Sequence, residues 1–100
     1  MTRLPTLRFP TLRRAFSGYL HEDGLVEAGS PEAALQSFWA DASPAERGRF
    51  QRETARFLDR TAALAFPDVC DVLERLGSRW RPPSREALTR VLTGVADAPA

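Results

Sequence analysis

The chain has 100 residues, of which 43% are hydrophobic, and this size suits one modest core and excludes several separate domains. Its 14 basic residues, all arginine, nearly balance 13 acids, which excludes a strong overall attraction to nucleic acid or anionic membranes. Cys70 is the single cysteine, so no intramolecular disulfide can form, and a reducing cytoplasm is the expected compartment.

The N-terminal region is basic and lacks acids, as in a transit peptide, but its apolar residues follow the spacing of a core-facing helix. Arginines and prolines interrupt each apolar stretch there, so we expect no secretory signal. No segment approaches the roughly twenty apolar residues that span a bilayer. These features predict a cytoplasmic protein.

The N-terminal half predicts two helices joined by a polar loop. The first is expected over about Thr11–Leu20, where apolar residues recur at spacings of three and four, and it meets the loop at His21. The second begins after Ser30, whose hydroxyl can accept a backbone N–H, with Pro31 at the first helical position. Its wide apolar face indicates a central helix.

The longest predicted helix covers about Pro44–Leu64. Ser43 and Glu46 have the spacing of a capping box at its start. One side is apolar, and four arginines follow another: Arg49, Arg52, Arg56 and Arg60. This row could contact phosphates, although Glu53 and Asp59 dilute it. A solvated surface with ion pairs explains the same residues and is favoured.

Two shorter helices are predicted in the C-terminal part. Pro67 begins the first, and Gly77 is placed for a left-handed turn at its end. Ser84 caps the second, which we expect to end at Gly94.

The fold class follows from these elements. No alternating strand pattern, hairpin signal or internal repeat is found in the sequence. We therefore predict an all-α, compact single-domain bundle of about five short helices over residues 1–94, with a disordered tail over residues 95–100. Trp39 and Trp80 are expected to lie in the core or to line a groove.

Few residues could support catalysis or metal binding. His21 is the only histidine, and its neighbours Glu22 and Asp23 point in divergent directions, so they form no metal face. We expect the His21 imidazole to contact the last carbonyls of the first helix. Cys70 lies on an apolar stripe and is interpreted as a buried core residue. We predict no catalytic residues, no metal and no cofactor.

Acidic residues are concentrated in one segment. Six acids and no arginine lie between His21 and Glu46: Glu22, Asp23, Glu27, Glu32, Asp41 and Glu46. Glu32 and Glu46 occupy helix N-termini, whereas the first three acids fall in the predicted loop. A local acidic surface favours rapid encounter with a basic partner. We therefore interpret this segment as a binding surface.

Several short motifs occur in an order typical of one family. They are Phe9-Pro10, Gly18-Tyr19-Leu20-His21-Glu22-Asp23, Gly29-Ser30-Pro31-Glu32-Ala33-Ala34-Leu35, and Trp80 followed by Pro82-Pro83. With them the chain resembles, from about Phe9 to Leu92, the CdiI-type immunity proteins of bacterial contact-dependent growth inhibition systems. It departs from the family pattern at Gly24, where an aromatic residue is expected, and at Glu22, where glutamine is more usual.

The resemblance implies a small cytoplasmic helical protein, without enzymatic activity, that binds and neutralises the toxic C-terminal domain of a cognate toxin. A nuclease toxin would suit the acidic segment, and neither nucleic acid nor membrane is expected as a partner. The predicted partner-binding residues are His21, Glu22, Asp23, Glu27 and Glu32. Two alternatives stay open: a small arginine-rich regulator that binds nucleic acid, and an adaptor of unknown partner.

Overall fold

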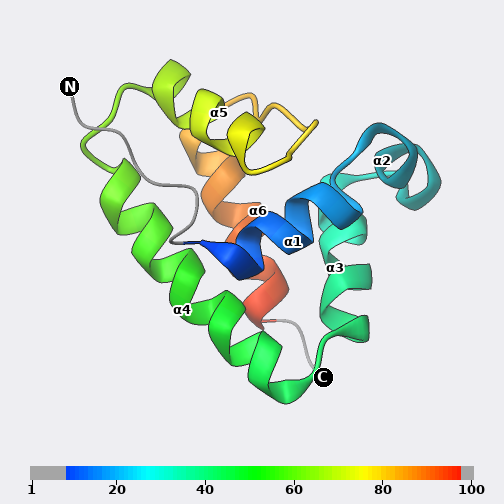
Figure 1. The fold of residues 1–100 in the computed structure, drawn as a ribbon. Helices are drawn as coiled ribbons and strands as arrows, with labels where there is room; N and C mark the ends of the chain where they lie inside the picture. The colour runs from blue at the N-terminus through cyan, green and yellow to red at the C-terminus, as the bar shows by residue number, and fades with distance from the viewer. Residues whose placement is uncertain (1–8, 98–100) are drawn as a thin grey trace.

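The computed structural model describes residues 9–97, which form six α-helices and no strand (Figure 1). The helices are α1 (Pro10–Tyr19), α2 (Glu22–Ala28), α3 (Pro31–Asp41), α4 (Pro44–Thr61), α5 (Phe66–Arg75) and α6 (Arg85–Asp97). The predicted all-α class is confirmed for these residues. There is one helix more than expected because the segment predicted as a polar loop contains α2.

The predicted helix ends depend on local side-chain caps. Ser30 and Ser84 each accept a hydrogen bond at 3.1 Å from the backbone amide three residues later. Ser43 accepts from the Glu46 amide at 3.1 Å, and the Glu46 carboxylate accepts from the Ser43 amide at 3.4 Å. Gly77 has a φ of 102°, which confirms the predicted left-handed turn after α5.

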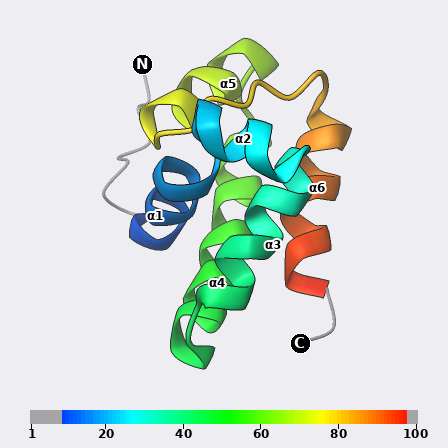
Figure 2. The same cartoon turned by 90° about the vertical axis from the view of Figure 1, so that its right-hand side faces the viewer.

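One hydrophobic core is enclosed by four helices. The helices α3 and α4 each pack against both α1 and α6, and α5 covers one end of this arrangement (Figures 1 and 2). The largest fully buried side chains are phenylalanines, namely Phe9, Phe16, Phe50 and Phe57. Phe9 and Phe57 meet edge to face, with ring centroids 5.4 Å apart. Phe9 and Val95 belong to the same core cluster, so the core joins the two ends of the described chain.

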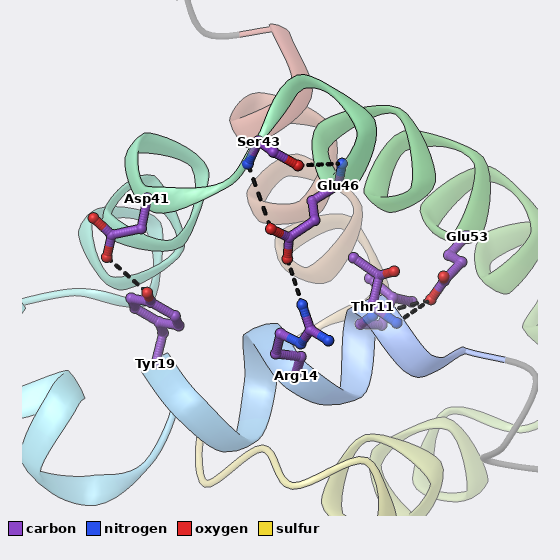
Figure 3. Close-up of polar contacts among 8 residues, drawn as sticks. Thr11, Arg14, Tyr19, Asp41, Ser43, Glu46 and Glu53 are labelled. Atoms are coloured by element: carbon purple, nitrogen blue, oxygen red, sulfur yellow. Dashed lines mark hydrogen bonds and ion pairs between the residues drawn. The ribbon is translucent and has the colours of Figure 1, made fainter.

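The N-terminus of α1 is capped by a residue from another helix. Phe9, at the N-cap position, has no side chain that can accept a hydrogen bond. Instead, the carboxylate of Glu53 in α4 accepts from the backbone amides of Thr11 at 2.8 Å and Leu12 at 3.0 Å (Figure 3). Glu53 is buried, so the expectation that it dilutes an exposed arginine row is wrong.

The last helix is longer than predicted. It continues through Gly94 to Asp97, and the Val95 side chain is buried. Glycine within a helix costs only about 1 kcal/mol, which the burial of valine offsets at about 1.5–3 kcal/mol. The expected helix end at Gly94 is therefore wrong. Of the predicted tail, residues 98–100 lie outside the described residues, as do residues 1–8.

Candidate partner-binding surface

The short helix α2 projects from the bundle between the end of α1 and the start of α3 (Figure 1). None of its residues is fully buried. Leu25 and Ala28 are partly buried and pack against the core, which holds the helix in place. The side chains on its other faces are directed toward solvent. This helix contains three of the five predicted binding residues.

His21 is the N-cap of α2. Its Nδ1 accepts a hydrogen bond from the backbone amide of Gly24 at 3.0 Å. The expected contact between the imidazole and the last carbonyls of the first helix is therefore corrected: His21 stabilises the start of the next helix instead. Because Nδ1 acts as an acceptor, the imidazole has a fixed orientation at the junction of α1 and α2.

The acidic residues of α2 fall into two groups. Glu22 and Asp23 lie in the first turn, where a negative charge favours the helix, so the expectation that they lie in a loop is wrong. Glu27 lies in the last turn, where the helix dipole disfavours a carboxylate. All three side chains are exposed, and within the described part of the chain none has an ion-pair partner. Stabilisation of the helix therefore explains why acidic residues occur at Glu22 and Asp23, but it does not explain the acid at Glu27.

Val26 was not predicted as a binding residue. It is 82% exposed, and no other large hydrophobic residue in the described part of the chain is classed as exposed. It follows Glu22 by four residues and Asp23 by three, so these carboxylates share its side of the helix. Leu25 and Ala28 form the inward side of α2, which leaves Val26 outside it, and the sequence gives no sign of this because the segment is predicted as a loop. An apolar side chain among acids thus forms the outer face of α2.

Gly24 allows α2 to lie close to α1. A Cβ atom added at this position would lie 2.5 Å from the Tyr19 carbonyl oxygen and 3.2 Å from Cε1 of His21. Such a contact with backbone cannot be relieved by a side-chain rotation. The glycine that departs from the family pattern is therefore required by the way this chain packs the two helices.

A hollow of about 320 Å³ lies where α1, α2 and α3 meet, and His21 and Glu27 are among its lining residues. Tyr19 forms part of its wall, and its hydroxyl donates a hydrogen bond to the Asp41 carboxylate at 2.7 Å (Figure 3). This bond to a carboxylate, together with desolvation, raises the pKa of Tyr19 above 10.0. Tyr19 is therefore a fixed, neutral hydrogen-bonding group at the wall of the hollow.

The predicted binding residues come together only in part. His21 and Glu27 line the hollow, whereas Glu22 and Asp23 lie on exposed positions of α2. Glu32 is exposed in the first turn of α3 and does not line the hollow. The candidate surface is therefore defined as α2, with its cap His21 and the adjoining hollow.

The family model described as CdiI immunity protein matches residues 8–97, a range that contains all six helices. The chain belongs to this family. No curated protein and no solved structure matches it. The resemblance inferred from the sequence motifs is thereby confirmed, and the matched range of this CdiI immunity protein includes α2 and its hollow.

The arginine row lies on α4 of the immunity protein. Its members are exposed: Arg49, Arg52, Arg56 and Arg60. The Arg56 guanidinium lies over the Phe9 ring, 5.3 Å from its centroid, so this arginine also packs against the start of α1. Contact between the row and phosphates stays an untested alternative.

The two tryptophans occupy the places predicted for them. Trp39 is in the core, with the Arg47 guanidinium 5.3 Å from its ring centroid. Trp80 is half-buried and lines a second hollow, as does Cys70. Cys70 is a free, buried thiol, as interpreted from the sequence.

Residues 9–97 contain no group of three or more histidine, cysteine, aspartate or glutamate side chains placed to hold a metal ion. Within the same range, no helix has the length and apolar character needed to cross a membrane.

Proposed function

We propose that this CdiI immunity protein binds and neutralises the toxic C-terminal domain of a cognate contact-dependent growth inhibition toxin, using α2 and the adjoining hollow. The observation that carries the proposal is the outer face of α2, where carboxylates without an ion-pair partner among residues 9–97 accompany the exposed Val26. Unpaired charge on an exposed helix steers encounter with an oppositely charged protein. Family membership supplies the class of partner.

The chemistry of α2 specifies the surface it would contact. Glu22, Asp23 and Glu27 require a basic surface, and Val26 requires a small apolar depression within it. A nuclease domain has such a basic surface, because its own substrate is a polyanion. Covering that surface with α2 would exclude the substrate. His21 has no catalytic role in this proposal because its Nδ1 already caps α2.

Co-expression with a toxin C-terminal domain, taken from a toxin gene that lies directly before the immunity gene, tests the proposal. We expect cells that produce both proteins to grow, cells that produce the toxin domain alone to stop growing, and the two chains to purify as a stable complex. Continued growth arrest together with the absence of a complex between the purified chains would refute the proposed function.

Charge reversal on α2 tests the surface itself. In the variant E22K/D23K/E27K, we expect the association rate constant with the toxin domain to fall about tenfold or more at low salt, and less at high salt where the charges are screened. Stopped-flow fluorescence or surface plasmon resonance at two ionic strengths measures this rate.

The matched control is D59K/D68K/E86K, which reverses three exposed acids away from α2. Asp68 and Glu86 lie in first helical turns, as do Glu22 and Asp23, so the control reproduces the unfavourable helix-dipole effect. Its association rate should stay near that of the wild type. Equal rates for both triple variants would place the interface elsewhere.

A further inference from the structure

The segment between α5 and α6 is not helical, but its backbone is firmly held. Ser78 is buried, and its hydroxyl donates to the Trp80 carbonyl at 2.9 Å and accepts from the Trp80 amide at 3.1 Å. The Arg79 amide donates to the Leu20 carbonyl at 2.8 Å, and Pro82 is buried. The bonds of Ser78 hold residues 78–80 in one turn, and the bond from Arg79 joins this turn to Leu20 at the end of α1.

A hollow of about 190 Å³ opens beside this segment and is lined by Cys70, Glu74, Ser78, Arg79, Trp80 and Arg81. Trp80 is half-buried and lines the hollow. Arg79 and Arg81 are exposed, and their guanidinium groups have no hydrogen-bond or ion-pair partner among the described residues. Tryptophan and arginine are the residues most enriched at the energetic centres of protein interfaces.

The hollow beside Trp80 lies close to the candidate surface. The hydrogen bond from the Arg79 amide ends on Leu20, and the next residue, His21, caps α2. The segment between α5 and α6 also runs beside α2 in both views of the fold (Figures 1 and 2). A partner that extends from α2 across the junction of α1 and α2 would therefore meet the segment that contains Trp80.

We propose that Trp80, Arg79 and Arg81 form a second recognition site for the same toxin domain, which accepts an acidic side chain and a neighbouring apolar group. This inference rests on the proposed function. The surface of the toxin domain would carry both charges: a basic region facing α2, and a carboxylate facing the two arginines. Arginine suits a carboxylate because its planar guanidinium donates two parallel hydrogen bonds. The fixed backbone reduces the entropy lost on binding.

A carboxylate on a protein fits this site better than nucleic acid does. Glu74 lines the hollow, and α2, whose first turn carries Glu22 and Asp23, follows Leu20, the residue that accepts from the Arg79 amide. A polyanion would bring several phosphates near these carboxylates and be repelled. A single aspartate or glutamate side chain can reach the arginines without that cost.

The test compares two double variants and one single variant in binding to the toxin domain. R79E/R81E should weaken the complex about 100-fold, mainly through faster dissociation, and W80A should weaken it about tenfold or more. The Arg79 contact with Leu20 uses backbone atoms, so R79E/R81E should keep the fold. R52E/R90E is the control, because it makes the same change in net charge on α4 and α6 and should bind as the wild type does.

The outcomes separate the two proposals. If the wild-type protein forms no complex with the toxin domain, the proposed function fails and this inference fails with it. If the wild type binds and R79E/R81E binds equally tightly, only the second site is refuted. Titration with single- and double-stranded oligonucleotides tests the alternative ligand. If the wild type binds them in a salt-dependent manner and R79E/R81E does not, the hollow is a nucleic-acid site and the second toxin-binding site is refuted.

Discussion

The buried carboxylate of Glu53 has a structural role that its charge does not suggest. An ionised side chain inside a protein is costly unless hydrogen bonds satisfy it. Here one oxygen accepts from two amides at the start of α1, which would otherwise be buried donors without partners. The contact joins residues separated by 42 positions in the chain. A single side chain therefore both caps α1 and connects it to α4.

Removal of this acceptor should destabilise the whole fold. We expect E53A to lower the free energy of unfolding by about 2–4 kcal/mol, because two buried amides lose their hydrogen-bond acceptor. E53Q keeps an oxygen at the same position and should lose about 1–2 kcal/mol. Urea denaturation followed by circular dichroism measures both values. A loss for E53A no larger than that for E86A, at an exposed position, would contradict the capping role.

The placement of α2 depends on glycine at position 24, which has no Cβ atom. Because a Cβ at Gly24 would meet the Tyr19 carbonyl at 2.5 Å, the close approach of α2 to α1 is available only to glycine. The hollow lined by Tyr19, His21 and Glu27 has its shape because of this approach. The relation between two short helices thus sets the geometry of the candidate surface.

Alanine at two glycine positions should have opposite effects. G24A should lower the free energy of unfolding by about 1–2 kcal/mol, since overpacking costs about 1–3 kcal/mol and the gain in helix propensity is only about 1 kcal/mol. G94A lies in α6, and its Cβ would meet nothing within 4 Å. It should raise stability by about 0.5–1 kcal/mol. Thermal unfolding of the two variants and the wild type measures these changes in stability. A G24A variant more stable than the wild type would disprove the close contact between α2 and α1.

The parts of the fold that depend on neighbours in sequence could be predicted. Ser30, Ser43 and Ser84 were assigned as caps because an N-cap acts within three residues, and all three bonds are present. The helix α2 was missed because it has only seven residues and starts with a histidine cap. The role of Glu53 could not be predicted, because its partners lie 41 and 42 residues away and only tertiary packing brings them together.

The candidate site shows the same limit. Its acidic residues were identified from the local excess of charge, which is a property of the sequence. Val26 required knowledge of which side of α2 faces the core, and the hollow beside Trp80 depends on the hydrogen bond between Arg79 and Leu20. These two features of the candidate site therefore depend on contacts between residues distant in sequence, which local sequence patterns do not reveal.

Across the whole molecule, resistance to acid should depend in part on Glu46. Its carboxylate accepts from the Ser43 amide and pairs with Arg14 of α1, so it links α1 to α4 (Figure 3). Two hydrogen bonds hold the pKa of Glu46 below its ordinary value of 4.5. The bond from the Ser43 amide has the larger effect, and the bond from Arg14 has the next largest. The contribution of Glu46 is therefore present above pH 4.5 and is lost as the pH falls through the lower, folded-state value.

Comparison with E46Q isolates this contribution. Glutamine resembles a protonated glutamate, so the two proteins should differ in free energy of unfolding at pH 7 and converge as the pH falls below 4.5. Because Arg14 is largely exposed, added salt should reduce the difference at pH 7. Chemical denaturation over a pH series gives the two curves. Parallel curves down to pH 3 would show that the carboxylate contributes nothing as a charge.

Few side chains of α2 contact the core, so the sequence of this helix should diverge faster than that of the rest of the protein. Leu25 and Ala28 are the apolar side chains of α2 that pack against the core, whereas positions 22, 23, 26 and 27 are exposed, so substitutions at these four codons should leave the core unchanged. A duplicated gene would thus begin with an intact core and four exposed positions that can vary. Under selection by rival strains, we expect divergence to accumulate first at those codons while the phenylalanine core stays constant.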